Sequence, residues 1–347
     1  MRRQQGLSLT ELLIALVVGL FITAATFSVL EMSSASVQST GQFNQLQESA
    51  RLALRVIEED IAQSGFFSDL SGVDLITGTN ATLPAAVSGT DCVGAGLNNG
   101  SFPNGIGNFR TLWATTRGAE PVMSCESGAV PGSDVLQVKR LEGAPVFGTP
   151  SAGHYYAIVN INEIAFFAGN ETPPVLPGGR IYEYQHRVYY VANNELGEPT
   201  LYRHGLARGD LMAAAEPLAA GIEAIQFEFG VDMDGDGAVD NYLMSIDIDD
   251  AIWDQVNRTE VLTVRVHLLV RALTKDNTYS GGGDRTYRMP AGDRVAADDG
   301  YRRKRVSTTI MVQNPWLSGP DDTASQRETS PCSRPRMLLS RCKHRHY

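Results

Sequence analysis

This sequence of 347 residues has no CxxC cysteine pair, no common catalytic signature and no excess of basic residues. Its four cysteines include no CxxC pair, so zinc ribbons and thioredoxin-like redox motifs have no support. A formal net charge of -10 argues against nucleic acid as the main partner, because phosphate binding needs clustered Lys and Arg. No GxxxxGK[ST], HExxH or GxSxG motif occurs. We therefore predict that the protein is not an enzyme.

What the sequence does contain is one long apolar run near its start. No charged residue lies between Leu12 and Leu30. From Leu7 the run is long enough to cross a bilayer core of about 30 Å at about 1.5 Å per residue. Arg2 and Arg3 precede it, which keeps the N-terminus cytoplasmic and sends the rest of the chain outward. A cleaved secretory signal would have a shorter apolar region and an A-x-A-like exit site. We therefore predict a retained, single transmembrane helix.

One carboxylate interrupts this apolar run. An isolated charge such as that of Glu11 costs about 2.5–3.5 kcal/mol in a membrane and marks a functional site by default. Cleavage after Gly6 would give Leu7 a new α-amine, which is charged at neutral pH and could neutralise Glu11 of a neighbouring copy. A plain signal anchor with a stray Glu is the alternative.

The segment from Gly6 to Leu12, GLSLTEL, resembles the prepilin signature, with Gly before the cut and Glu at the fifth mature position. Thr10 departs from it, since an aliphatic residue is usual there. The resemblance implies cleavage between Gly6 and Leu7 by prepilin peptidase, methylation of the new N-terminus and assembly into a pilus or pseudopilus. It also implies an inner-membrane location with the C-terminal domain in the periplasm, and residence in the pilus after assembly.

The remaining pattern predicts an α+β protein with a type IV pilin-like fold, in which a long N-terminal helix packs on an antiparallel β-sheet domain. An apolar stripe at helical spacing runs from Phe43 to Ile61, and Gly65 is the expected stop. Strand-like runs recur from Asp134 onward, over Asp134–Leu141, His154–Phe167, Arg180–Ala192, Thr200–His204, Ile222–Gly230, Glu260–Leu273 and Val306–Val312. The expected parts are a leader (1–6), a transmembrane half-helix (7–30), an amphipathic half-helix (31–65), a periplasmic β-rich domain (66–314) and a disordered tail (315–347).

Residues 68–134 are rich in Gly, Asn, Ser, Thr and Pro, and we expect a loop-dominated insertion there. It holds Cys92 and Cys125. If the domain is exported, these two are the natural disulfide candidates, and two free buried thiols are the alternative.

Four internal segments resemble the PilW family of minor pilins: QESARLALRVIEEDIAQSGFF, GSDVLQVKRL, GIEAIQFEFGVDMDGDGAVDNY and YRRKRVSTTIMVQN. This resemblance implies a low-abundance subunit that helps to initiate type IV pilus assembly at or near the tip, with other minor pilins and the major pilin as partners. A pseudopilin of type II secretion related to GspJ is the nearest alternative. A tip adhesin and, more weakly, a membrane-anchored periplasmic hydrolase are the others.

One acidic loop suggests a metal site. The residues Asp232, Asp234, Asp236 and Asp240 occupy positions 1, 3, 5 and 9 of an EF-hand-like loop, and the carbonyl of Ala238 would take position 7. Leu243 stands at position 12 instead of the bidentate Glu, and the flanks read as strands. We favour Ca²⁺ binding here, and an acidic hairpin turn without an ion is the alternative.

Overall fold

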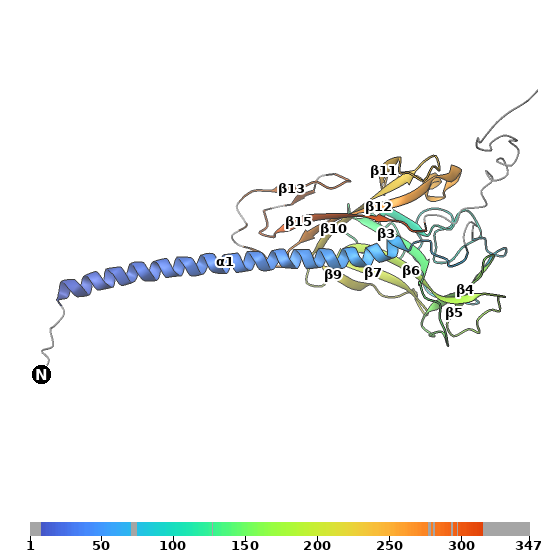
Figure 1. Ribbon diagram of the computed structural model, residues 1–347, viewed down its shortest axis with the longest axis horizontal. Helices are drawn as coiled ribbons and strands as arrows, with labels where there is room; N and C mark the ends of the chain where they lie inside the picture. The colour runs from blue at the N-terminus through green and yellow to red at the C-terminus, as the bar shows by residue number, and fades with distance from the viewer. Residues whose placement is uncertain are drawn as a thin grey trace, which may run out of the picture.

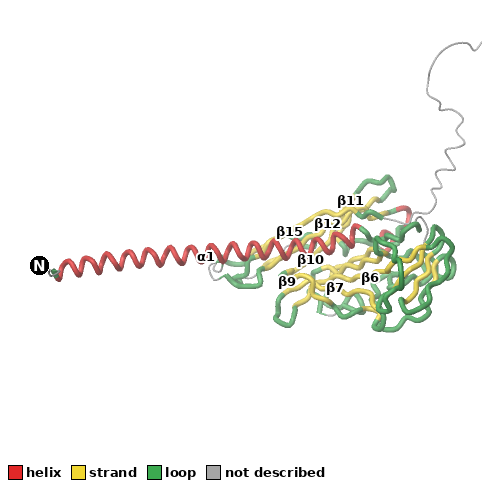
Figure 2. The backbone as a smooth tube through the Cα atoms, turned by 60° about the horizontal axis from the view of Figure 1, so that its bottom comes forward, coloured by secondary structure: helices red, strands yellow, loops and turns green. Residues whose placement is uncertain are grey.

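One helix dominates the outline of the molecule (Figure 1). The computed structural model describes residues 8–314 except 71–74, 127, 277–278, 280–281, 293 and 297. Gly6, Leu7 and the predicted tail therefore lie outside the described residues. The helix, α1 (Leu9–Ala62), has 54 residues, which corresponds to about 80 Å at about 1.5 Å per residue. Its N-terminal half projects from the β domain and its C-terminal half runs across it (Figures 1 and 2).

The described strands form two sheets and one hairpin. The larger sheet contains β1 (Ala81–Thr82), β2 (Leu112–Thr116), β3 (Asp134–Leu141), β4 (Tyr155–Val159), β5 (Ile164–Ala168), β6 (Arg180–Asn193), β7 (Pro199–Ala207), β8 (Leu211–Met212) and β9 (Glu216–Ala220). The second sheet has the order β11 (Asn241–Met244), β10 (Ile222–Asp232), β12 (Glu260–Arg271), β15 (Arg303–Met311). The hairpin is β13 (Arg285–Tyr287) with β14 (Arg294–Ala296), and the short helices are α2 (Asp250–Trp253) and the 3₁₀ turn η1 (Val256–Arg258).

Strand pairing agrees with the antiparallel prediction almost throughout. The long strand β6 pairs with β3, β4 and β7, and each of these ladders is antiparallel. The short β1–β5 contact is parallel. The expected strand run over 154–167 is instead the hairpin β4–β5, because Asn160 turns the chain by accepting the N–H groups of Asn162 and Glu163. The described residues between 68 and 134 are mostly loop, as predicted, with β1 and β2 as short strands.

The core lies between α1 and both sheets. The C-terminal half of the helix contacts β10, β12 and β15 of the second sheet and β3 and β9 of the larger one. Its buried apolar residues are Leu46, Ala50, Ala53, Ile57 and Ile61. The predicted stripe was wrong at its start. Phe43 is 43% exposed beside the guanidinium of Arg302, and Gln42 faces inward instead, donating to the Thr274 carbonyl at 3.2 Å.

The end of α1 is set by Gly65, as expected. The helix stops at Ala62, and Gly65 follows with a φ of +71°, a conformation that favours glycine. Its N–H donates to the carbonyl of Lys139 in β3 at 3.1 Å. A Cβ at this position would lie 2.8 Å from the carbonyl oxygen of Asn314, just after β15. The close approach of three chain segments therefore requires glycine here.

Candidate functional site: the N-terminal helix and the acidic loop

The helix begins with a capping box built on Ser8 and Glu11. The Ser8 hydroxyl accepts the N–H of Thr10 at 3.3 Å, and Ser8 N–H donates to the Glu11 carboxylate at 2.9 Å. The Thr10 hydroxyl lies 2.7 Å from that of Ser8, which gives this unusual polar residue a local partner. The carboxylate that the sequence singled out therefore already accepts one hydrogen bond within its own chain.

Beyond this cap the helix presents apolar side chains to its surroundings. From Leu9 to Ser34 every described side chain is exposed, and Gln42 is the first buried one. An 18-residue window in α1 has a mean hydropathy of 2.5 and is 0% buried, so among the described residues α1 qualifies by length and composition as a membrane span. A core helix of a soluble domain would bury such a surface. The apolar half of α1 needs either lipid or other helices around it.

A buried carboxylate fixes the other half of α1 to the β domain. Asp60 is fully buried, and its Oδ1 lies 2.9 Å from Nη2 of Arg140 in β3 and 2.7 Å from Nη1 of Arg187 in β6. Its Oδ2 accepts the hydroxyl of Tyr189. Glu142 also contacts both arginines, at 3.3 Å and 3.2 Å. We call these five residues the Asp60 cluster.

The Asp60 cluster makes a specific electrostatic joint between helix and sheet. Burial, and next the charge of Asp60, raise the pKa of the Tyr189 hydroxyl, so it remains a donor. Undocking the helix would separate Asp60 from its partners and leave buried charges uncompensated. The cluster therefore holds α1 in its docked position. Sequence reasoning missed this cluster. Asp60 follows Glu58 and Glu59 in the printed sequence, and only its place on the stripe side of the helix could have distinguished it.

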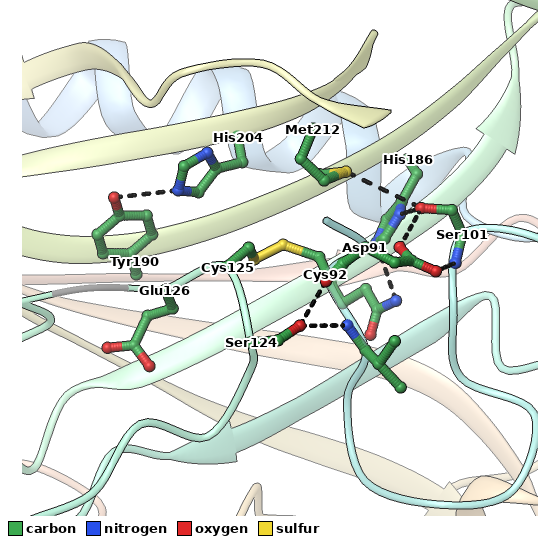
Figure 3. The surroundings of a disulfide bond; sticks show 12 residues. Asp91, Cys92, Ser101, Ser124, Cys125, Glu126, His186, Tyr190, His204 and Met212 are labelled. Atoms are coloured by element: carbon green, nitrogen blue, oxygen red, sulfur yellow. Dashed lines mark hydrogen bonds between the residues drawn. A yellow bond between two sulfur atoms is a disulfide. The ribbon is translucent and has the colours of Figure 1, made fainter. Parts of the chain in front are cut away.

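The structure joins Cys92 and Cys125 in a disulfide, with their Cα atoms 4.9 Å apart (Figure 3). Beside it, the Ser101 hydroxyl lies 2.6 Å from the Asp91 carboxylate and 2.7 Å from Nδ1 of His186. A hydrolytic triad would place the imidazole between the other two groups, whereas here the hydroxyl is in the middle. Ser101 and His186 are also fully buried. We therefore assign this chain of hydrogen bonds to holding the disulfide loop on the sheet.

The acidic loop folds around Asp232, the last residue of β10. Its Oδ1 accepts the N–H groups of Asp234 at 3.1 Å and Gly235 at 2.7 Å, and its Oδ2 accepts that of Gly237 at 2.7 Å. Burial alone would raise the pKa of Asp232, but these backbone hydrogen bonds outweigh it and lower the pKa. Both glycines have positive φ, at +78° and +83°. The sequence DMDGDG thus forms a tight turn around an ionised carboxylate.

Three of the predicted metal ligands come together here. Oxygen atoms of Asp232, which is buried, and of Asp234 and Asp240, which are exposed, all lie within 4.8 Å of one another, so this group could hold a metal ion. Asp236 does not belong to this group, and its Oδ1 accepts the N–H of Ala238 at 2.8 Å. The role expected for the Ala238 carbonyl stays a prediction.

A fourth carboxylate lies beside the loop. Glu260 of β12 pairs directly with Asp232 of β10, and both burial and the charge of Asp232 raise the pKa of Glu260. Leu243, at the position where an EF-hand has its bidentate Glu, instead pairs with Phe229 in the β10–β11 ladder. The loop therefore differs from an EF-hand in two ways. It connects two strands instead of two helices, and the nearest further carboxylate, that of Glu260, comes from a neighbouring strand.

Comparison with known proteins agrees with this arrangement. Residues 1–27 match the prokaryotic N-terminal methylation motif. Residues 188–314, from the middle of β6 to the end of the described chain, match the family of type IV pilus-assembly protein W. The match to that family covers about a third of the chain and lies in the C-terminal part of the β domain. That family consists of pilin-like structural proteins of the pilus, which are typically not enzymes.

No curated protein matches the chain. A type IV-like pilin from Thermus thermophilus is similar in structure, with 12% sequence identity and a TM-score of 0.34, over 78% of this chain and 96% of the Thermus chain.

Proposed function

We propose that this protein is a PilW-type minor pilin that helps to initiate type IV pilus assembly and is incorporated at or near the pilus tip. In this proposal prepilin peptidase cuts between Gly6 and Leu7. Residues 7–30 then hold the subunit in the inner membrane, with the domain in the periplasm, until it leaves the lipid for the fibre. Other minor pilins and the major pilin are its partners.

The division of α1 into two unlike halves carries this proposal. The half that begins at Leu9 is apolar and exposed, while the half that ends at Ala62 is locked to two sheets by its stripe and by the Asp60 cluster. Lipid and a bundle of sister helices solvate such a surface equally well, because both are apolar. A subunit built this way can exchange one environment for the other while its domain stays folded.

Glu11 makes the environment in the fibre more favourable than the one in the membrane. In lipid its carboxylate has the Ser8 N–H as a donor, which satisfies one of its acceptor sites. The α-amine that cleavage creates on Leu7 of a neighbouring subunit would add a charged partner, and charged hydrogen bonds contribute more than neutral ones. Assembly is then favoured over residence in the membrane.

The test is the fate of tagged Glu11→Ala in living cells, with Glu48→Ala, an exposed change on the same helix, as the matched control. We expect Glu11→Ala to remain in the membrane fraction and to be depleted at least tenfold in sheared pili, whereas Glu48→Ala behaves like the unmodified chain. Normal incorporation of Glu11→Ala would refute the assembly role.

Gene deletion separates the alternatives. Loss of surface pili supports assembly, and intact pili that no longer attach would support a tip adhesin. Normal pili with impaired protein secretion would support a GspJ-like pseudopilin.

The acidic loop is proposed to bind Ca²⁺. Three converging carboxylates repel one another unless a hard cation lies among them, and oxygen ligands are those that Ca²⁺ prefers. Calorimetric titration should detect Ca²⁺ binding that is lost in Asp234→Asn with Asp240→Asn and kept in Asp236→Asn, whose carboxylate lies outside the group. Undetectable heat at millimolar calcium, or equal loss in all variants, would contradict the site.

A further inference from the structure

The end of the β domain nearest to the exposed half of α1 has a distinct composition. The chain leaving β12 touches the helix where it emerges, with the Thr274 carbonyl accepting from Gln42 at 3.2 Å and the Lys275 carbonyl from Gln38 at 3.4 Å. The chain entering β15 reaches the same level through Arg302, whose guanidinium lies 5.5 Å from the Phe43 ring. Figure 1 shows the β13–β14 hairpin on this side of the domain.

Cations and aromatic rings alternate in this region. Arg302 lies 4.4 Å from the ring of Tyr279, while Lys275 and Arg271 lie 5.3 Å and 4.4 Å from that of Tyr301. We call these five residues the basal collar. Tyr with Lys and Arg is the composition found where membrane proteins meet lipid headgroups, because such side chains combine an apolar body with a polar or charged tip.

Asp276, which lies beside the collar, does not cancel its charge. Asp276 is buried and pairs with Arg302 at 2.8 Å, which leaves Lys275 and Arg271 in excess. Nearby, Asp298 and Asp299 are engaged with Arg285 and Arg303. Lys275 itself is exposed. The three cations of the collar less the charge of Asp276 leave a net charge of +2 beside the helix, on a chain whose total is -10.

Helix geometry places the collar close to the headgroup surface. The uncharged run ends at Leu30, and Gln38 follows eight residues later, about 12 Å along the axis. A headgroup zone extends about 5–7 Å beyond each side of the hydrocarbon core. Lys275, which contacts Gln38 through its carbonyl, thus lies within about one Debye length of the headgroup surface, and helix tilt brings it closer.

We propose that the basal collar binds anionic lipid headgroups and seats the domain on the membrane surface before assembly. This proposal rests on the membrane-anchored state in the proposed function. It implies that entry into the fibre must break the lipid contact of the collar as well as withdraw the helix.

The experiment uses the full-length chain in nanodiscs of phosphatidylcholine, with or without phosphatidylglycerol. A fluorophore on Thr274→Cys, in a background with Cys332 and Cys342 changed to Ser, is quenched by nitroxides carried on lipid headgroups. The same label on Arg208→Cys is the control. Arg208 is exposed and its N–H donates to the Gly153 carbonyl beside β4, at the far end of the domain (Figure 1).

We expect phosphatidylglycerol to increase quenching at position 274 and not at 208. The Lys275→Gln variant should weaken lipid contact about fivefold, as expected for one basic charge near the surface, and high salt should remove the effect of phosphatidylglycerol. Equal quenching in neutral and anionic discs, with the chain still co-eluting with the discs, would refute lipid binding by the collar and leave the membrane anchoring intact. A chain that fails to stay in the discs would overturn the anchored state.

Discussion

The joint between α1 and the β domain gives the sharpest prediction for stability. Asp60→Ala removes the carboxylate that faces Arg140, Arg187 and the hydroxyl of Tyr189, and it leaves the guanidinium of Arg140 buried at 1% exposure. Breaking a buried ion pair from one side costs about 3–5 kcal/mol. Asp60→Asn keeps the shape but loses the charge, so we expect a loss of about 2–3 kcal/mol.

Urea unfolding of the full-length chain in detergent, followed by circular dichroism and tryptophan fluorescence, measures these losses. Glu59→Ala is the matched control, because that neighbouring side chain is exposed, and its effect should stay within about 0.5 kcal/mol. Replacing both buried charges, in Asp60→Leu with Arg140→Met, should recover more than half of the loss. An Asp60→Asn protein within about 0.5 kcal/mol of the unmodified chain would refute the cluster as the joint.

Two further predictions concern the β domain. Replacing Cys92 and Cys125 by Ser opens a loop with a sequence separation of 33, and denaturant unfolding should show a loss of stability of about 3.5 kcal/mol. Reductant should have no further effect on this variant. An unchanged unfolding midpoint would contradict a stabilising disulfide. Burial, and next the charge of Lys139, lower the pKa of His186 in the folded chain, so stability is full above the unfolded pKa near 6.5 and falls as the pH drops below it. His186→Gln should flatten that dependence between pH 7.5 and pH 5, and an equal slope in both proteins would exclude His186 as its source.

Much of the fold follows from local patterns in the sequence. The apolar run, the stripe from Leu46 to Ile61 and the glycine at 65 predicted α1 and its end, because helix periodicity and the left-handed stop are properties of neighbouring residues. Asp134–Leu141 was predicted as a strand and is β3 with the same bounds.

What the sequence could not show is how distant residues meet. The division into two sheets depends on which strands pair, and hydrophobic alternation does not encode that. The β13–β14 hairpin, with three residues in each strand, is too short for a periodic signal. The Asp60 cluster combines a helix with two strands far along the chain, so no local spacing could reveal it.

In the candidate metal site, too, local spacing predicted some features and tertiary contacts determine the others. In the acidic loop, close spacing predicted the meeting of Asp232, Asp234 and Asp240, because all three belong to one turn. Spacing did not predict that Asp236 lies outside this group, and the approach of Glu260 depends on the β10–β12 register.

The most direct test of the whole account is the mass of the mature N-terminus. The protein purified from sheared pili should begin at Leu7 and carry a methyl group on its α-amine, because only that chain end can offer a cation to Glu11 of a sister subunit. A protein that still carries Met1–Gly6 would contradict the account.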